Sequence, residues 1–577
     1  MITARRPSAK RIAAPDVPHT LAHHMNVEPT TAAPQLASPR TGPSARLAGY
    51  LLPPYGIYLL WQQRASTLAA AFGTLGLLVY LVLYTGLGIA LLKLTGKAEI
   101  DWRGYGRPRL VWSTGVRTSA AWQTSNTAID TNSGAYWTDY RGPQRDGRYD
   151  ETPIRTDWQQ SPPRLLWKAD LGGGHASMTI AQGRLFTMEQ WAEGEAITAY
   201  NAADGKGLWK KLYPARFNDA YGMGGAGPRS TPTWHDGRVY ALGAEGHLHC
   251  LDAADGRVVW QKNILEEHGT RNLMFGLCAS PLVVSNAVIV TAGARAGAGR
   301  NTVIAYHKDT GAVLWAAAAE NQAYMSPMRV TLAGTEQLLI TGARQLMGLS
   351  LTDGKPLWSL GWSVSYDNNI AQPLVVSTNR VFISAGYGKG CALVEIAAKD
   401  DPFTANKIWE NKHLKNKFAS SVLHEGHIYG LDDSGNDDAA HLVCLDASTG
   451  EPKWRADNYG HGQLLLASGH LLISCEDGNM ALVKATPESH QLVARLPALD
   501  GKTWNNPALA GGKLYLRNGR MMACYDIRPD ASAGTRGIST AGPEDLQVVL
   551  VAFALMSVMG ATLLVGITKW RRRSSVQ

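Results

Sequence analysis

The stretch GPRSTPTWHDGRVYALGAEGHLHCLDAADGRVVW, residues 227–260, holds short apolar runs separated by three glycine-containing turns. Asp236-Gly237 precedes the run RVYAL, Glu245-Gly246 precedes HLHCLD, and Asp255-Gly256 precedes RVVW. Because glycine supplies the positive φ that a tight hairpin needs, each of these pairs is typical of a turn between two antiparallel strands. The stretch therefore predicts one sheet of four short strands.

The end of this stretch recurs along the chain. Similar endings are ADGKGLW at 203–209, DTGAVLW at 309–315, TDGKPLW at 352–358 and STGEPKW at 448–454. The repeated positions lie 41 to 55 residues apart, and a repeat of this length with four strands is the pattern of a β-propeller blade. We interpret the repeated tryptophans as structural docking residues between blades: Trp167, Trp209, Trp260, Trp315, Trp358, Trp409 and Trp454, with Arg495 in the eighth position.

The number of blades follows from the innermost strands. We expect these strands to start near His175, Ser230, Ala279, Ser326, Ala371, Ser420, Gln463 and Pro507, which predicts eight blades. The last blade has only three strands of its own, so RLLWKA at 164–169 is expected to supply the fourth and close the ring. The predicted fold class is all-β, an eight-bladed propeller of four-stranded antiparallel blades flanked by two transmembrane helices.

Two apolar segments flank the repeats. Residues 67–92 contain no charged side chain and are long enough to cross a bilayer as a helix, and a second apolar run covers 548–568. The expected order is a disordered basic cytoplasmic tail (1–46), an interfacial apolar segment (47–66), a transmembrane helix (67–92), a stalk leading into the propeller (93–163), the propeller (164–527), a linker (528–547), a transmembrane helix (548–568) and a basic cytoplasmic tail (569–577).

Charge predicts the orientation. The net charge of +9 lies outside the predicted spans and the propeller region, since residues 1–66 carry +5 and Lys569, Arg571, Arg572 and Arg573 carry +4. A near-neutral propeller argues against nucleic-acid binding. The basic cluster after the second span predicts a cytoplasmic C-terminus by the positive-inside rule. We therefore expect an inner-membrane protein with both termini cytoplasmic and an extracytoplasmic, periplasmic propeller, although basic residues that follow the first span oppose this orientation.

The six cysteines suggest packing rather than chemistry. Cys250, Cys444 and Cys524 occupy the third-strand position that Ala199 and Ala305 fill in other blades, which favours small buried residues. No CxxC pair and no haem-attachment motif is present in the sequence.

The repeats, with DYRGPQRDG at 139–147, GYGKGCALVEI at 386–396 and KFASSVLHEGHIYGLDD at 417–433, resemble the PQQ-like, or quinoprotein alcohol dehydrogenase-like, eight-bladed propellers, in a membrane-anchored bacterial branch. The resemblance implies the fold over 136–527. It implies two kinds of function, because the family includes dehydrogenases that bind pyrroloquinoline quinone (PQQ) and Ca²⁺ and also noncatalytic propellers such as the lipoprotein of the outer-membrane β-barrel assembly machinery. The dehydrogenases place two adjacent cysteines over the quinone, and no two cysteines are adjacent here.

The loops before the innermost strands are expected to line one mouth of the central channel, where propellers bind ligands. Arg229 and Lys417 could pair with carboxylates of an anionic ligand, and Trp504 could stack on a ring. Asp367 is the candidate general base, and with Asn368 and Asn369 it could hold a hard cation. His461 completes the predicted cofactor-binding set. Simpler interpretations are also open: Asp367 and the two asparagines are typical of an Asx turn, Arg229 could hold loop carbonyls, and His461 could hydrogen-bond within its loop.

Two functions therefore remain open from the sequence. One is a PQQ-dependent dehydrogenase of small alcohols or sugars, with Ca²⁺ if PQQ is bound. The other is a noncatalytic propeller that binds a protein, peptide or small molecule on one face.

Overall fold

The computed structural model describes residues 98–103, 107–112, 122–134, 136–218, 225–295, 301–317, 320–398, 403–433, 435 and 440–529. The predicted spans at 67–92 and 548–568 and both predicted tails lie outside these residues. No helix within the described ranges is long and apolar enough to cross a membrane.

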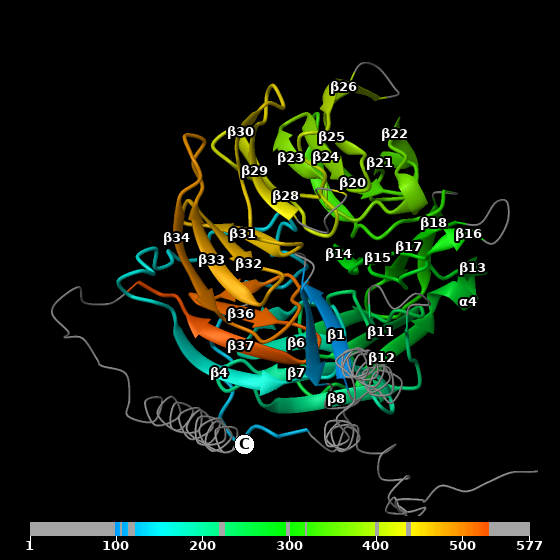
Figure 1. Cartoon of the computed structure of the whole chain (residues 1–577). Helices are drawn as coiled ribbons and strands as arrows, with labels where there is room; N and C mark the ends of the chain where they lie inside the picture. Colours follow the sequence, from blue (N-terminus) through cyan, green and yellow to red (C-terminus); the bar gives the residue numbers. More distant parts are fainter. Residues whose placement is uncertain are drawn as a thin grey trace, which may run out of the picture. The chain divides into compact units, whose positions relative to one another are not determined.

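Eight antiparallel sheets follow one another round a ring in chain order, so the predicted eight-bladed all-β propeller is confirmed (Figure 1). Blades 1 to 4 are β5 (Thr179–Ala181), β6 (Arg184–Trp191), β7 (Gly194–Asn201) and β8 (Gly207–Tyr213); β9 (Thr233–His235), β10 (Arg238–Leu242), β11 (His247–Asp252) and β12 (Val258–Asn263); β14 (Leu282–Val284), β15 (Ala287–Thr291), β17 (Val303–His307) and β18 (Val313–Ala317); and β19 (Met328–Leu332), β20 (Thr335–Thr341), β21 (Gln345–Leu349) and β22 (Pro356–Gly361).

Blades 5 to 8 complete the ring. They are β23 (Leu374–Ser377), β24 (Arg380–Ala385), β25 (Gly390–Ala397) and β26 (Thr404–Asn411); β27 (Val422–His424), β28 (His427–Asp433), β29 (Ala440–Asp446) and β30 (Pro452–Ala456); β31 (Gln463–Ala467), β32 (His470–Ser474), β33 (Asn479–Lys484) and β34 (Leu492–Pro497); and β35 (Ala508–Ala510), β36 (Lys513–Arg517), β37 (Met521–Asp526) and β4 (Arg164–Asp170). Smaller elements are the hairpin β1 (Ala98–Arg103) and β2 (Arg107–Trp112), the pair β13 (Thr270–Arg271) and β16 (Ala294–Arg295), α4 (Ile264–His268) and the 3-10 turn η2 (Ser365–Asp367).

The ring closes as the sequence predicts. Strand β4 pairs antiparallel with β37, so the N-terminal side of the propeller completes the last blade. A further strand, β3 (Arg148–Tyr149), runs parallel to β31 at the channel side of blade 7, which the sequence did not predict. Closure joins the first and last blades covalently through the chain and leaves no blade incomplete.

The repeated glycine and tryptophan interlock neighbouring blades. The indole N–H of Trp209 donates to the Ala253 carbonyl of blade 2 at 3.1 Å. A Cβ on Gly256, in the same turn, would lie 2.6 Å from the Trp209 ring, and Gly256 has φ +74°. The same pairing joins Trp167 with Gly205, Trp260 with Gly311, Trp315 with Gly354, and Trp409 with Gly450. The position therefore requires glycine both for its positive φ and for the indole that covers it. Trp358 differs, because its N–H donates to Gln337 Oε1 within its own blade at 2.6 Å.

A belt of hydrogen bonds joins the blades where the innermost strands begin. The backbone N–H of Ser177 donates to Thr231 Oγ1 at 2.9 Å, and the same bond runs from Thr231 to Ser280, Ser280 to Ser326, Ser326 to Gln372, and Gln372 to Ser420 at 2.8–2.9 Å. The Gln463 amide donates to the carbonyls of Phe418 and Trp504, and Ser177 Oγ donates to the Asn506 carbonyl at 2.6 Å. Because these residues bond to the next blade, most innermost strands begin one to four residues later than predicted.

The segment from 136 to 149 plugs the channel below this belt. Arg145 is buried and donates to the carbonyls of Ser280 at 3.1 Å and Pro327 at 2.8 Å, and its charge is paired with Asp139. Arg141, also buried, donates to the carbonyls of Ser421 at 3.1 Å and Leu464 at 3.3 Å. The RGPQRDG motif therefore fastens the innermost strands of blades 3, 4, 6 and 7 and closes one end of the channel.

Candidate functional site

The loops before the innermost strands meet at the end of the ring where the belt lies, and we call this end the mouth. At the mouth, the hydroxyl of Tyr140, a residue of the plug, accepts from Asn506 Nδ2 at 3.2 Å. Burial raises the pKa of Tyr140, and the nearby Cys278 thiol also raises it. Since the plug occupies the channel below the belt, we consider the mouth as the candidate face for a ligand.

Lys417 and His461 meet at one buried carboxylate. Asp433, at the end of β28, has its Oδ1 atom 3.7 Å from Lys417 Nζ and 3.7 Å from His461 Nε2. Asp433 and His461 are 3% and 5% exposed. The Lys417 ammonium also lies over the rings of Tyr387 at 5.7 Å and Phe418 at 5.6 Å. The fold thus brings Lys417 and His461, which the sequence predicted as site residues, to Asp433, which the sequence did not predict.

Trp504 lies beside this group and is held in place by Glu476. Its indole N–H donates to Glu476 Oε1 at 2.9 Å, while the backbone N–H of His461 donates to Glu476 Oε2 at 2.8 Å. The Trp504 ring is 4.8 Å from the Phe418 ring and 5.9 Å from the His175 ring. The Lys502 ammonium lies 3.5 Å from the centre of the Trp504 ring, so a cation already covers one face of this indole.

Arg229 lies on the other side of the mouth. Its guanidinium donates to the carbonyls of Gly227 and Gly225, both at 2.8 Å, and stacks over Phe217 at 5.0 Å. Arg229 also lowers the pKa of Cys278, although burial dominates and raises that pKa to about 11. These contacts agree with the simpler interpretation of Arg229, in which its side chain holds loop carbonyls.

Asp367 lies apart from Lys417 and His461. Its side chain is 44% exposed at the end of η2, where Oδ1 is 3.8 Å from Arg344 Nε. Asn369 is buried and uses its amide N–H₂ group to hold the carbonyls of Gly342 and Trp362. Asn368 hydrogen-bonds Tyr387. The described residues contain no group of three His, Cys, Asp or Glu side chains that could hold a metal ion, and a calcium ion at Asp367 and Asn368 would have a single carboxylate ligand. The general-base role of Asp367 stays a prediction.

Several mouth residues were missed by sequence reasoning. Phe418 directly follows Lys417, and Asp433 ends the segment KFASSVLHEGHIYGLDD, so both lay within a motif that was already noted. Tyr140 likewise lies in the DYRGPQRDG segment, whereas Glu476 comes from the turn before β33 and carries no comparable signal. Only the ring closure brings these distant segments together.

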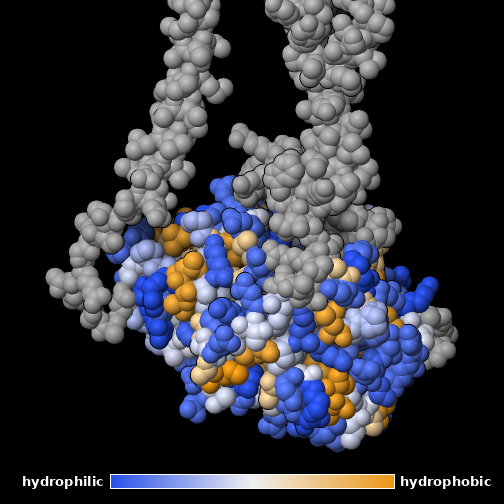
Figure 2. Space-filling model, turned by 90° about the horizontal axis from the view of Figure 1, so that it is seen from below, coloured by the Kyte–Doolittle hydropathy of each residue, from blue (hydrophilic) through white to orange (hydrophobic). Residues whose placement is uncertain are grey.

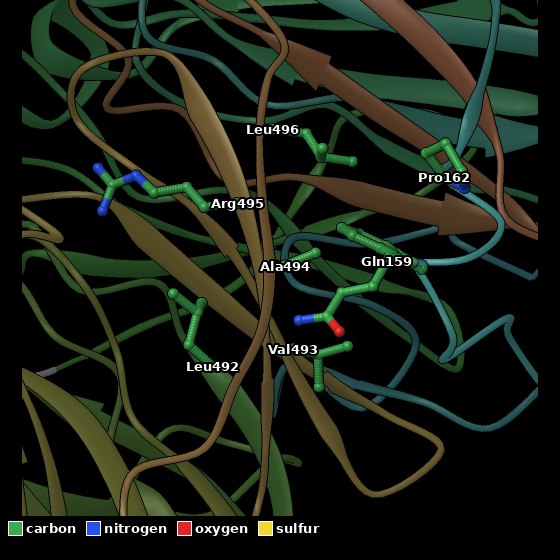
Figure 3. Close-up of a pocket in the computed structure, with 8 residues that line it drawn as sticks. Gln159, Pro162, Leu492, Val493, Ala494, Arg495 and Leu496 are labelled. Carbon is green, nitrogen blue, oxygen red and sulfur yellow. The ribbon is translucent and has the colours of Figure 1, made fainter.

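A separate cavity of about 420 Å³ lies on the outer strand of blade 7, lined by β34 and by Trp158, Gln159 and Pro162 (Figure 3). In Figure 3 the Arg495 side chain points away from Gln159 and Pro162. Arg495 instead pairs with Asp477 at 3.0 Å. The groove therefore lies where the eighth repeat has no docking tryptophan. We place the candidate site at the mouth, where charged, hydrogen-bonding and aromatic groups converge.

Comparison with known proteins identifies the family. The sequence profile described as "Outer membrane protein assembly factor BamB" matches residues 155–293 and 193–456, more than half of the chain. The chain belongs to this family of PQQ-like propellers. Membership follows from the repeats that build the blades, and it covers most of the ring.

Individual relatives divide between two kinds of protein. The chain is 27% identical over 159 residues to the dehydrogenase subunit of a quinone-type alcohol dehydrogenase from Komagataeibacter europaeus, covering 26% of this chain and 21% of that one. It is 23% identical over 332 residues to the assembly factor BamB from Nitrosomonas eutropha, covering 53% and 68%. This chain thus matches about a fifth of the dehydrogenase's length. A europium-containing methanol dehydrogenase shares the fold with a TM-score of 0.51 at 11% identity, covering 68% of this chain and 98% of that one.

The mouth does not fit a calcium-bound quinone. Asp367 is exposed beside an arginine, Asn369 holds loop carbonyls, and one face of Trp504 is covered by Lys502. All six cysteines are free, and no two are adjacent in the sequence. We therefore derive no redox step at this site. What the mouth does provide is ammonium groups beside aromatic rings.

Proposed function

We propose that the plugged channel mouth binds a small anion that carries a ring system, and that the protein is a binding propeller rather than an alcohol dehydrogenase. The observation that supports this most is the position of the Lys417 ammonium. It lies over the rings of Tyr387 and Phe418, and the Phe418 ring in turn contacts the Trp504 ring. An ammonium gives an anion a charge-assisted hydrogen bond, and the rings offer faces for stacking.

Both carboxylates of the mouth contact its own residues, and the mouth also holds three cations. Asp433 lies against Lys417 and His461, and Glu476 accepts from Trp504 and His461. Arg229, Lys417 and Lys502 outnumber these two carboxylates. A ligand carboxylate near Lys417 would meet a positive potential in a partly buried, low-dielectric setting.

PQQ itself is a suitable probe, because it is a planar tricarboxylate with a visible absorbance. We expect the purified full-length protein to bind PQQ saturably in the presence of a calcium chelator. Lys417→Ala should weaken binding at least tenfold, which corresponds to about 1.4 kcal/mol or more for one charge-assisted contact. Lys355→Ala is the matched control, since its ammonium is 80% exposed in a turn on the opposite face.

Three outcomes would contradict the proposal. They are the absence of saturable binding, unchanged affinity in Lys417→Ala, and calcium-dependent binding accompanied by dye-linked alcohol oxidation. The last result would instead support the function as an alcohol dehydrogenase.

We also propose that residues 67–92 and 548–568 tether the propeller to the inner membrane, with the propeller in the periplasm and both termini in the cytoplasm. The supporting observations are the lengths of the two apolar segments and the basic cluster after the second. Alkaline phosphatase fused after residue 530 should be active, and the same fusion after residue 577 should be inactive. The reverse pattern would invert the topology.

A second candidate function is an interaction propeller for a protein partner, and the BamB description of the matching family favours it. On the face seen in Figure 2, hydrophobic residues form separate patches among hydrophilic ones. Crosslinking in native membranes should recover one defined partner if this function operates. Failure to capture any defined partner would count against it.

A further inference from the structure

A second polar cluster lies at the same end of the propeller, between blades 1 and 2. Glu195 near the start of β7 is fully buried, and its Oε2 accepts from the Tyr213 hydroxyl at 2.6 Å. The Tyr213 ring lies 4.6 Å from His249 and 5.4 Å from His247, both in β11. Gly243 fits tightly here, because a Cβ on it would lie 2.4 Å from the Tyr213 hydroxyl and 2.6 Å from Glu195 Oε2.

The groups around Glu195 stabilise its ionised carboxylate only weakly. Burial and, less strongly, Glu245 raise the pKa of Glu195 to about 7, while Tyr213, the Ala244 N–H and Arg229 oppose this shift. Glu195 Oε1 has no hydrogen-bond partner among the residues that the structure describes. His249 supplies no counter-charge, because burial together with His247 and Lys211 lowers its pKa to about 4.

This cluster is connected to a loop at the channel mouth through one residue, Ala244. The N–H of Ala244 faces the Glu195 carboxylate, and its carbonyl accepts from the Leu277 N–H at 2.9 Å and from Asn272 Nδ2 at 3.0 Å. Leu277 directly precedes Cys278, whose thiol lies near Tyr140. The turn 243–246 therefore lies between Glu195 and the 272–278 loop.

We infer that Glu195 is a proton-controlled latch between blade 1, the turn 243–246 and the 272–278 loop. When Glu195 is protonated, a neutral carboxyl group fits the closed, dry packing around Tyr213 and Gly243. When it is ionised, an anion with one unpartnered oxygen draws in water or Arg229, and the packing against the turn loosens. The inference goes beyond ligand binding and holds whether or not the mouth binds an anion.

Hydrogen exchange on the full-length protein tests the latch. After correction for the intrinsic pH dependence of exchange, peptides that cover 243–246 and 272–278 should exchange at least fivefold faster at pH 8 than at pH 6. Glu195→Gln, which mimics the neutral form, should remove this difference. Glu451→Gln is the matched control, because Glu451 lies exposed in a turn of blade 6 and should leave the difference unchanged.

A second variant keeps the test decisive if Glu195→Gln folds poorly. Tyr213→Phe removes the hydroxyl that stabilises the carboxylate, so the loosening should shift to a higher pH. Equal corrected exchange at pH 6 and pH 8 in the wild-type protein would overturn the latch. So would a Glu195→Gln protein that keeps the wild-type difference, or a Tyr213→Phe protein with an unshifted midpoint.

Discussion

The glycine of each repeat has two roles: it adopts a positive φ, and it leaves room for the indole ring of the neighbouring blade. Two variants can measure these roles separately. Gly256 and Gly237 both lie in turns of blade 2 with nearly the same φ, +74° and +73°. A Cβ on Gly256 would lie 2.6 Å from the Trp209 ring, whereas a Cβ on Gly237 would have no atom within 4 Å. The two positions share the backbone cost and differ only in the indole contact.

Gly256→Ala should therefore destabilise the protein more than Gly237→Ala. Both lose about 1 kcal/mol from the left-handed backbone, and Gly256→Ala should lose a further ~1–3 kcal/mol because the added methyl group displaces Trp209. Urea denaturation of the two variants measures the difference. Equal losses would show that the interlock with Trp209 contributes nothing.

Glu195 should make stability depend on pH. Its folded pKa of about 7 lies above the usual value of 4.5, so its contribution is fully favourable below pH 4.5 and is lost as the pH rises to 7 and beyond. The loss amounts to about 3 kcal/mol at most. Comparing the urea midpoints of the wild-type protein and Glu195→Gln from pH 5 to pH 8 should show a difference that grows with pH in favour of Gln. A difference independent of pH would exclude this titration.

At the scale of the strands, the belt explains why the blades behave as one ring. In blades 1 to 5 the backbone N–H of the belt is buried and has its acceptor on the next blade, so these blades depend on their neighbours to satisfy this donor. A buried donor without an acceptor costs more than the hydrogen bond itself contributes.

Ser280→Ala removes the acceptor of the Thr231 N–H, and we expect a loss of about 1–3 kcal/mol. Ser489→Ala, at an exposed position in the loop before β34, should stay within about 0.5 kcal/mol of the wild-type protein. Thermal denaturation of the two variants makes the comparison. Equal stability of Ser280→Ala and Ser489→Ala would contradict this expectation, because it would mean that water takes over as the acceptor of the Thr231 N–H.

Strand positions could be predicted because hairpin turns and alternating apolar residues are local signals. The RVYAL run indeed forms β10, and the expected closing strand at 164–169 forms β4. The starts of most innermost strands were set too early, because serine and threonine side chains of the neighbouring blade take hydrogen bonds that the local pattern assigns to the sheet. Strand β3 was missed because two residues carry no periodic signal.

At the scale of the whole molecule, the sequence could predict the ring but only part of the mouth. Lys417, His461 and Trp504 were identified because each precedes an innermost strand, and the propeller geometry brings such residues together. Asp433 and Glu476 could not be identified, since their roles depend on contacts between blades. Asp367 was selected as the one carboxylate of its loop, yet the loop turns it outward to Arg344.

The plug determines which face can bind a ligand. Arg141 and Arg145 are buried under the belt and take the carbonyls of four blades, so the channel is closed on the side where the chain enters it. We therefore expect a ligand to bind at the mouth, beside Tyr140. The plug and the mouth are therefore two parts of the same candidate binding site.

A crystal structure of the protein equilibrated with PQQ in the presence of a calcium chelator tests this account most directly. We predict PQQ density above Tyr140, with a carboxylate within hydrogen-bond distance of Lys417 Nζ and a ring against Phe418 or Trp504. PQQ density in the blade 7 groove beside β34 with the mouth left empty would contradict the account, as would a mouth without PQQ at a saturating concentration.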